Sequence, residues 1–299
     1  MISTSTARPS RVGDPLLALS HLTDRDRRLL GLLENHQVLT TDQIHRLFFT
    51  GLRTCQARLR LLHRVQLLDR FRQASLSGGP QEWRWTLGPT GARFQAAVAG
   101  RRPDSDRAHR DKVIRLMANP ALGHLLVTNE FFVRLLTTAR ATPTASLDRW
   151  WSERAATAAF LGIRPDGHAL WTAHGRTVGL FLEVDLGTED LPRVTAKLAA
   201  YARLARSGGP RYPVLFWLPG RQREINLRRH LESTHVEVPV ATATHDRDPA
   251  DAVWLPADAW RRVRLTDLDS HHGSDSAHNP NWRAGRLDLR SQPLTTGQW

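Results

Sequence analysis

The stretch that most constrains the fold is 163–201, which reads IRPDGHALWTAHGRTVGLFLEVDLGTEDLPRVTAKLAAY. Two segments rich in apolar residues, Arg164–Thr172 and Thr177–Leu186, are separated by the short polar turn Ala173–Arg176, a pattern typical of an antiparallel hairpin. Beyond this hairpin the apolar residues take helical spacing, and Asp190 is placed to cap the helix. The sequence therefore predicts two neighbouring strands followed directly by a helix.

The two predicted strands carry a pair of carboxylates, Asp166 and Glu183. Carboxylates on adjacent strands can hold a hard divalent cation, usually Mg²⁺, which activates water and stabilises charge on phosphate. The alternative is that Asp166 and Gly167 only make a turn, and that Glu183 and Asp185 lie on the solvated face of an edge strand. The apolar neighbours of Glu183 favour the metal hypothesis, because an acid in such a strand needs a partner or a metal.

A resemblance enters at these residues. A Glu-bearing helix, three strands, a helix and a further strand, with Pro-Asp on the second strand and E-x-D on the third, resembles the core of the PD-(D/E)xK nuclease superfamily. By position, Asp166 corresponds to the motif's Asp and Glu183 to its second acid, while Asp185 stands where the superfamily has Lys. Some members place the basic group on the following helix, and Lys197, which shares a helix face with Tyr201, is similar to that arrangement.

The resemblance implies a set of functional residues. Asp166, Glu183, Asp185 and Lys197 would be catalytic, with Mg²⁺ as the cofactor if the domain is active. The superfamily often carries a helical acid near the metal, and Glu130 on the predicted helix Leu125–Ala139 is similar to it. Asp166, Glu183 and Glu130 would then be the metal ligands, although a lone Glu on a helix is more often a surface residue.

Composition sets broad bounds on the class of protein. A chain of 299 residues that is 40% hydrophobic can bury a real core, and we expect two domains plus tails. The net charge of +13 is almost entirely due to arginine, since Lys112 and Lys197 are the only lysines. Such a charge favours nucleic acid or another polyanion as partner, although genome composition also enriches arginine. A single cysteine, Cys55, and the absence of any long apolar run or signal peptide predict a cytoplasmic protein without membrane association.

Three helices are predicted near the N-terminus. Thr23 is placed as the N-cap of the first, with Asp26 in the capping-box position, and a second helix begins at Thr40. The third begins near Thr50–Leu52. Two strands, Leu68–Gln73 and Glu82–Leu87, follow on either side of a Ser-Gly-Gly-Pro turn at residues 77–80. This order is that of a winged helix-turn-helix, which lays its third helix in the major groove of DNA.

Polar residues of the third helix and of the hairpin are the candidate DNA contacts. Those expected to reach base edges or phosphates of double-stranded DNA are Arg53, Gln56, Arg60, Arg64, Arg72 and Arg84. The alternative is a winged helix that contacts protein, with the arginines as a solvated face. DNA is favoured because several of these residues fall on one side of the helix and the hairpin adds more.

The predicted domain organisation has four parts. Residues 1–18 form a flexible leader, 19–100 the winged-helix domain, 107–268 a PD-(D/E)xK nuclease-like domain, and 269–299 a disordered tail, with the polar segment Gly100–Asp106 as the boundary. The fold class is thus α+β, with a restriction-endonuclease-like α/β domain around a mixed central sheet. Elements expected in the second domain are helices His109–Met117 and Arg221–Glu232 and strands Asp148–Ala155, Tyr212–Leu218 and Val236–Ala241.

The layout as a whole, over about Leu22–Leu268, resembles the actinobacterial replication-relaxation family, found on plasmids and integrative elements and linked by name to plasmid replication and DNA relaxation. Its most specific part is Glu183–Glu189, which matches the family's E-x-D-x-G-T-E signature. The family pattern includes Asp185, so the absence of Lys at this position is not peculiar to this chain.

Two main functional hypotheses follow from these features. The first is a DNA-binding protein of a mobile element that nicks DNA with a Mg²⁺-dependent second domain. The second is a non-catalytic transcriptional regulator or replication accessory factor that keeps an inactive nuclease-like scaffold, and a protein-interaction adaptor is a third. The sequence leaves open a homodimer and contacts with plasmid replication or transfer proteins.

Overall fold

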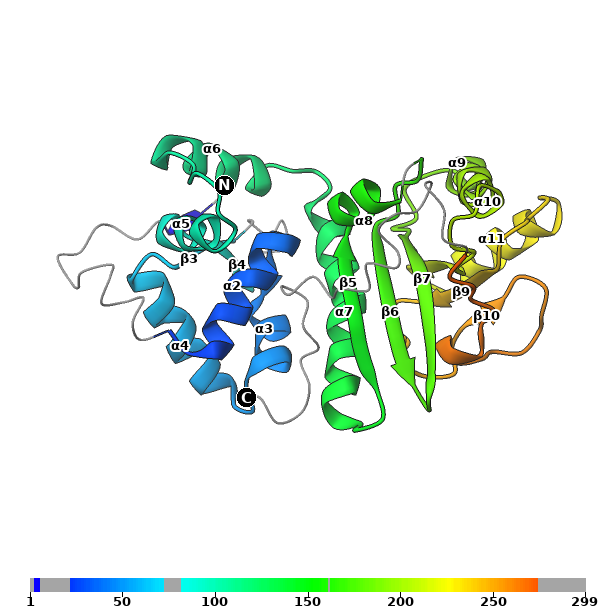
Figure 1. The fold of residues 1–299 in the computed structure, drawn as a ribbon, viewed down its shortest axis with the longest axis horizontal. Coiled ribbons are helices and arrows are strands. Elements are labelled where there is room, and N and C mark those ends of the chain that lie inside the picture. Colours follow the sequence, from blue (N-terminus) through cyan, green and yellow to red (C-terminus); the bar gives the residue numbers. More distant parts are fainter. Residues whose placement is uncertain (1–2, 6–21, 73–81, 161, 274–299) are drawn as a thin grey trace. The chain divides into compact units, whose positions relative to one another are not determined.

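The computed structural model describes residues 3–5, 22–72, 82–160 and 162–273. The chain divides into two compact units, Met1–Val133 and Arg134–Gln298, whose helices and strands are labelled in Figure 1. The predicted turn at residues 77–80 and most of the predicted tail lie outside the described residues. Within the described residues, no helix is both long enough and apolar enough to cross a membrane.

The first unit combines helices with a small antiparallel sheet. Its elements, in chain order, are β1 (Ser3–Ser5), α2 (Asp24–His36), β2 (Leu39–Thr40), α3 (Thr41–Phe48), α4 (Leu52–Arg64), β3 (Leu68–Arg72), β4 (Arg84–Leu87), α5 (Pro89–Val98), α6 (Asp106–Met117) and α7 (Leu122–Ala141), the last of which continues into the second unit. The described strands are ordered β1-β3-β4-β2. The three predicted helices and the two predicted strands are all present, and the prediction missed α5.

Local polar contacts explain where the first helices begin. Thr23 and Asp26 form the predicted capping box of α2, with the Thr23 N–H donating to Asp26 Oδ2 at 2.9 Å. Thr40 and Gln43 form a second capping box at α3. Such reciprocal caps satisfy backbone donors that a helix start otherwise leaves unpaired. The amphipathic pattern of α4 then buries Cys55, Leu59 and Leu62.

Two features of the first unit differ from the prediction. Ser3–Ser5, within the predicted flexible leader, pair with β3 as an edge strand. The two compact units also divide later than the boundary predicted at 100–106, because α6 and the start of α7 belong to the first unit. Leu116, Met117 and Leu122 form one buried cluster with Val38 and Phe71. Burial of this apolar surface holds α6 on the first unit, which a polar Pro-containing segment in the sequence could not reveal.

The second unit is built on a six-stranded mixed sheet. Its elements are β5 (Ser146–Ser152), α8 (Glu153–Ala159), β6 (Gly167–Ala173), β7 (Arg176–Val184), α9 (Leu191–Ala196), α10 (Leu198–Arg206), β8 (Val214–Leu218), α11 (Arg221–Glu232), β9 (Val240–Thr244), β10 (Leu255–Pro256) and the 3-10 helix η1 (Leu265–Asp267). The strand order is β10-β9-β8-β7-β6-β5. Strands β5, β6 and β7 pair antiparallel, and β7, β8 and β9 pair parallel. The predicted mixed α and β architecture with a mixed central sheet is thereby confirmed.

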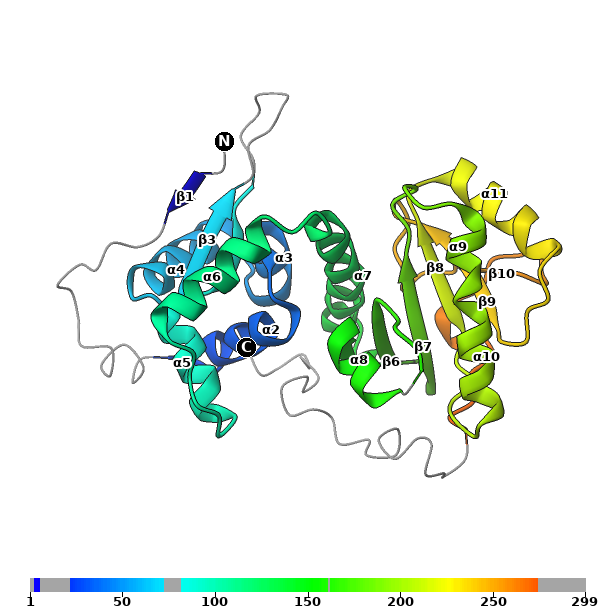
Figure 2. The same cartoon turned by 90° about the horizontal axis from the view of Figure 1, so that it is seen from above.

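One face of this sheet is covered by helices α8, α9, α10 and α11. Their buried residues form one core with Phe181, Val214, Phe216 and Val240 on the strands, and Figure 2 shows α9, α10 and α11 along the sheet. Arg134 stacks on Trp217, which points to the opposite face because side chains alternate along a strand. Because β7, β8 and β9 pair parallel, their carboxyl ends lie at one common edge of the sheet.

Several predicted boundaries in this unit shift. The predicted strand Asp148–Ala155 is β5 followed by the helix α8, and the predicted strand at 236–241 begins later, as β9. The single helix predicted after Glu189 is two helices joined at Lys197, although Asp190 caps the first as predicted. Helix α11 has the predicted bounds.

Candidate functional site

Asp166 lies directly before β6, where backbone and side chain both bind it to β7. Its N–H donates to the Leu182 carbonyl at 2.9 Å, and its Oδ2 accepts from the Val184 N–H at 2.7 Å. The antiparallel pairing of β6 with β7 positions these contacts on either side of Glu183. Asp166 is thus held near the Glu183 carboxyl, whose pKa it influences.

Glu183 lies near the end of β7 and points to the helix-covered face of the sheet. It is 3% exposed. Its Oε2 accepts from Lys197 Nζ at 2.5 Å, and its Oε1 accepts from the Tyr201 hydroxyl at 2.5 Å. The spacing of four residues brings Lys197 and Tyr201 to the same carboxyl, as their predicted common helix face requires.

The electrostatics of this cluster follow from burial. Burial and the charge of Asp166 together raise the pKa of Glu183 to about 7, against the opposing effects of Lys197 and Tyr201. Burial also raises the pKa of the Tyr201 hydroxyl well above its ordinary value, with Glu183 adding to the effect. Tyr201 is therefore a hydrogen-bond donor to Glu183 at neutral pH.

Lys197 connects the buried carboxyl to solvent. It stands at the junction of α9 and α10, and its side chain is 42% exposed. Burial disfavours its charge, but Glu183 and Asp166 outweigh that effect and raise the pKa of the ammonium. The arrangement thus stabilises a positive charge beside two carboxylates, at a place that solvent reaches.

Asp185, a predicted catalytic residue, is engaged elsewhere. Strand β7 ends at Val184, and the Asp185 carboxylate accepts from Arg223 Nε of α11 at 2.5 Å and from the Gly187 N–H at 2.7 Å. Arg223 also donates to the Glu189 carbonyl. Asp185 therefore fastens the turn after β7 to α11, and a catalytic role is not supported by its contacts.

Glu130, a predicted metal ligand, belongs to the first unit. Its Oε2 accepts from Arg46 Nη2 at 2.5 Å and from Gln43 Nε2 at 3.2 Å, both on α3. Across the described residues, no group of three or more His, Cys, Asp or Glu side chains is arranged to hold a metal ion. Glu130 is thus bound within the first unit, whereas Asp166 and Glu183 form a pair in the second unit.

The outer face of α4 carries four of the predicted DNA contacts. Arg53, Gln56, Arg60 and Arg64 are all exposed, and Arg60 Nε donates to the Gln56 carbonyl at 3.2 Å. Arg58 points the other way and pairs with the buried Asp26. The helix thus separates a polar outer face from residues that hold it to α2.

One face of the β3-β4 hairpin adds two more arginines to this basic surface. The Arg70 and Arg72 guanidinium carbons lie 4.1 and 3.7 Å from the centre of the Trp83 ring. Burial lowers the pKa of Arg70, and the charges of Arg72 and Arg60 lower it further, so Arg70 lies close to α4. We call Arg53, Gln56, Arg60, Arg64, Arg70 and Arg72 the α4 surface.

The structure does not bring Arg84 together with Arg72. Arg84 is opposite Phe71 in the hairpin, whereas Arg70 is opposite Trp85. Opposite residues share a face and successive residues alternate, so Arg84 lies on the face of Phe71, away from Arg72.

The prediction of functional residues missed three side chains. The sequence places Tyr201 on one helix face with Lys197 but does not identify it as a hydrogen-bond donor to Glu183. The spacing of four residues between Tyr201 and Lys197 is the signal for that role. Arg70, two residues before Arg72, could have been found from strand alternation. Arg223 carries no local signal, since its partner Asp185 is 38 residues away.

A comparison with protein families places much of the chain in a known family. A family model described as replication-relaxation matches residues 30–214, which is more than half of the chain. The matched segment includes the α4 surface and all of Asp166, Glu183, Lys197 and Tyr201. Searches of curated proteins and of solved structures gave no match.

Proposed function

The chain belongs to the replication-relaxation family, and we propose that it is a DNA-binding protein of a plasmid or integrative element that binds duplex DNA with its first unit and nicks it with its second. The family supplies the context of replication or relaxation. The α4 surface supports the role of the first unit, and the cluster around Glu183 supports the role of the second.

The α4 surface supports duplex binding. Helices α2, α3 and α4 followed by the hairpin β3-β4, with β2 beside β4, have the order of a winged helix. In such proteins the third helix enters the major groove, where Arg pairs with guanine and Gln with adenine. Arg53 and Gln56 are exposed near the start of α4, and Arg70 and Arg72 beside it are suited to phosphates.

The proposal that the second unit nicks DNA rests on one observation: Asp166 and Lys197 both lie close to the buried carboxyl of Glu183. The donor set fits a hard divalent cation, because it consists of carboxylate oxygens. The raised pKa of Lys197 indicates that the same place stabilises a positive charge. Asp166 and Glu183 would hold Mg²⁺ or Mn²⁺, which when bound activates water and stabilises charge on phosphate.

The remaining residues of the cluster have roles that follow from their contacts. Lys197 reaches solvent and can bind a non-bridging oxygen of a phosphodiester. Glu183, with a pKa of about 7, must release its proton before it can hold the cation, so cation binding would depend on pH near neutrality. Tyr201 fixes the orientation of the Glu183 carboxyl through Oε1.

A second candidate function is a non-catalytic replication accessory factor or transcriptional regulator. The specific observation in its favour is that both oxygens of Glu183 already accept hydrogen bonds, from Lys197 and Tyr201. In that case the cluster stabilises the second unit, and the protein acts through DNA binding alone.

Incubation with supercoiled plasmid separates the two functions. We expect the wild type to form open-circle DNA with Mg²⁺ or Mn²⁺ and not with EDTA. Asp166→Asn keeps an oxygen for the Val184 N–H, and Glu183→Gln keeps the side-chain shape, so both should fold and lose nicking. Glu153→Gln, an exposed acid of α8, is the control that should nick normally. Plasmid that stays supercoiled while gel shifts show binding would favour the second function.

Gel shifts on duplex DNA test the first unit. Arg53→Ala and Arg60→Ala should each weaken binding and flatten its salt dependence, by about 0.9 in the log–log slope for each phosphate that the variant no longer neutralises. Arg27→Ala, an exposed arginine on α2, is the matched control. Equal effects of all three substitutions would refute the assignment of α4 as the DNA-binding helix.

A further inference from the structure

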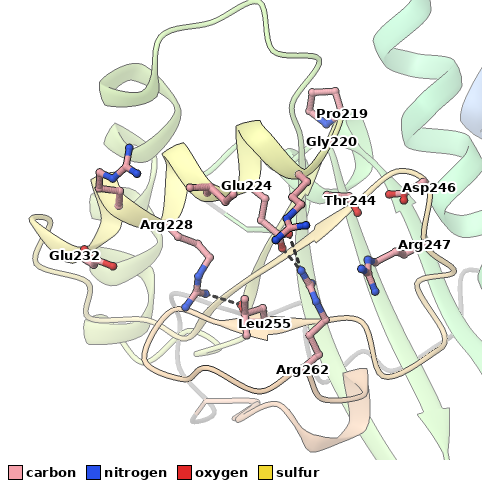
Figure 3. Close-up of a pocket in the computed structure, with 13 residues that line it drawn as sticks. Pro219, Gly220, Glu224, Arg228, Glu232, Thr244, Asp246, Arg247, Leu255 and Arg262 are labelled. Carbon is pink, nitrogen blue, oxygen red and sulfur yellow. Dashed lines mark hydrogen bonds and ion pairs between the residues drawn. The ribbon is translucent and has the colours of Figure 1, made fainter.

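The second unit contains a cavity of about 830 Å³ at the carboxyl ends of β8 and β9, shown in Figure 3. Pro219, Gly220 and Arg221 follow β8, and Asp246 and Arg247 follow β9. In open sheets with parallel strands, ligands bind outside these strand ends. Glu183 lies at the end of the neighbouring parallel strand β7, so the cavity and the Asp166 and Glu183 pair share one edge of the sheet.

The lining of this cavity is strongly basic. Its arginines are Arg221, Arg228, Arg229, Arg247 and Arg262, and its acids are Glu224, Glu232 and Asp246. Five cations against three anions leave an excess of positive charge. A cavity with this lining favours an anionic ligand over an apolar one.

Glu224 and Arg262, which both line the cavity, form an ion pair. Glu224 is 3% exposed, and its carboxylate accepts from Arg262 Nη2 at 2.6 Å and from the Thr242 hydroxyl at 2.8 Å. Figure 3 shows this pair meeting within the cavity lining. The charges of Glu224 and Arg262 therefore cancel locally, and the net charge of the cavity comes from the other residues.

The other arginines keep their charge. Arg228 donates to the carbonyls of Pro256 and Ala259, both at 2.8 Å, and carbonyls satisfy donors without neutralising a cation. Arg221, Arg229 and Arg247 are exposed. None of these four forms an ion pair with a carboxylate of the described residues. Arg221, Arg229 and Arg247 are thus available to bind phosphate.

An exposed aromatic ring lies on the loop that ends at Arg262. The loop between Leu255 and Arg262, which both line the cavity, carries Trp260 with 98% of its surface exposed. Arg228 holds this loop through Pro256 and Ala259. A loop held in this way, which presents a whole indole ring to solvent two residues before the cavity residue Arg262, is suited to stacking an unpaired base.

We infer that this cavity and Trp260 bind single-stranded DNA, with backbone phosphates held by Arg221, Arg229 and Arg247 and a base stacked on Trp260. A cavity of this size admits a single nucleotide unit and not a duplex, and stacked bases within a duplex offer no free face to an indole. The choice of DNA over another phosphate ligand rests on the proposed function. The site would hold the strand that is exposed when DNA is nicked or unwound.

Fluorescence anisotropy with a labelled oligothymidine of about 20 nucleotides, long enough to span a single-strand site of the usual size, tests this inference in the full chain. The double variant Arg221→Glu/Arg229→Glu should weaken binding at least about tenfold, since charge reversal replaces attraction by repulsion. Trp260→Ala should weaken it by about 5- to 150-fold, the range typical for removal of one stacked base. The matched control, Arg154→Glu/Arg203→Glu, reverses two exposed arginines on α8 and α10 and should bind as the wild type does.

Two further arms separate this site from the proposed function. Arg53→Glu/Arg60→Glu should lose duplex binding while keeping oligothymidine binding, and the cavity variants should show the reverse. Thymidine monophosphate and ATP are tested as competitors. Binding of oligothymidine that survives the cavity substitutions, or that is no tighter than binding of a mononucleotide, would overturn the inference whether or not the protein nicks plasmid.

Discussion

Replacing Glu183 by Gln tests the electrostatics on which the candidate centre depends. The carboxyl is 3% exposed and bound by Lys197 and Tyr201. Gln has nearly the same shape but no titration, so any difference in pH dependence between the two proteins reports the proton on Glu183. The loss of one matched hydrogen bond adds a constant that does not vary with pH.

The expected magnitude follows from the pKa of Glu183. Burial raises it from an ordinary 4.5 to about 7. A folded-state pKa above the unfolded one means that the folded protein holds the proton more tightly, so the stabilising contribution is full below pH 4.5 and lost as pH rises through 7. Each pH unit between these values corresponds to about 1.4 kcal/mol, which gives on the order of 3 kcal/mol in total.

The assay is urea unfolding of wild type and Glu183→Gln between about pH 4 and 8. We expect the free energy of unfolding of the wild type, taken relative to the variant, to fall by about 3 kcal/mol over this range. Glu153→Gln shows whether removal of a carboxylate alone produces such a slope. A difference that stays flat, or that grows with pH, would mean that the ion pair with Lys197 outweighs burial, and would refute the reasoning.

Three further predictions concern buried groups. Mg²⁺ should bind about tenfold more tightly at pH 8 than at pH 6, because Glu183 must lose its proton first, and calorimetry with Glu183→Gln as control checks this. Arg149 is 1% exposed, its three side-chain nitrogens lack hydrogen-bond partners among the described residues, and burial lowers its pKa. Arg149→Met should therefore raise the free energy of unfolding by about 1–3 kcal/mol, as measured by denaturant titration. Burial raises the pKa of the Cys55 thiol to about 12, so a thiol reagent should label the protein only after denaturant is added; labelling of the native chain within minutes would contradict this.

The features that the sequence predicts well are those whose physics is local. Thr23 and Asp26 are three residues apart, so a capping box is legible in the sequence and is present in the structure. The spacing of Lys197 and Tyr201 places both on one helix face, and the structure joins both to Glu183. The apolar spacing of α4 likewise separates its buried residues from its arginines.

The features that the sequence does not predict depend on distant partners. Glu130 is bound by Arg46, 84 residues away, and Asp185 by Arg223, 38 residues away. Either acid could have faced a metal as far as local pattern goes, because spacing within one element does not determine which other element packs against it. The break between α9 and α10 at Lys197 also has no Gly or Pro signal at that residue.

Asp185 stands where the resemblance to the PD-(D/E)xK nucleases would place a Lys, and we propose that Lys197 supplies that basic group instead. β7 ends before Asp185, and the side chain meets Arg223 and the Gly187 N–H. In Asp185→Lys/Lys197→Met, the new ammonium would face the Arg223 guanidinium and leave Arg223 Nε unpaired, so the free energy of unfolding should fall by about 3 kcal/mol. Nicking should stay as low as in Lys197→Met alone. Restored nicking in the double variant would show that the strand position is equivalent to the helix position, and that the Asp185–Arg223 contact does not direct the side chain away from Glu183.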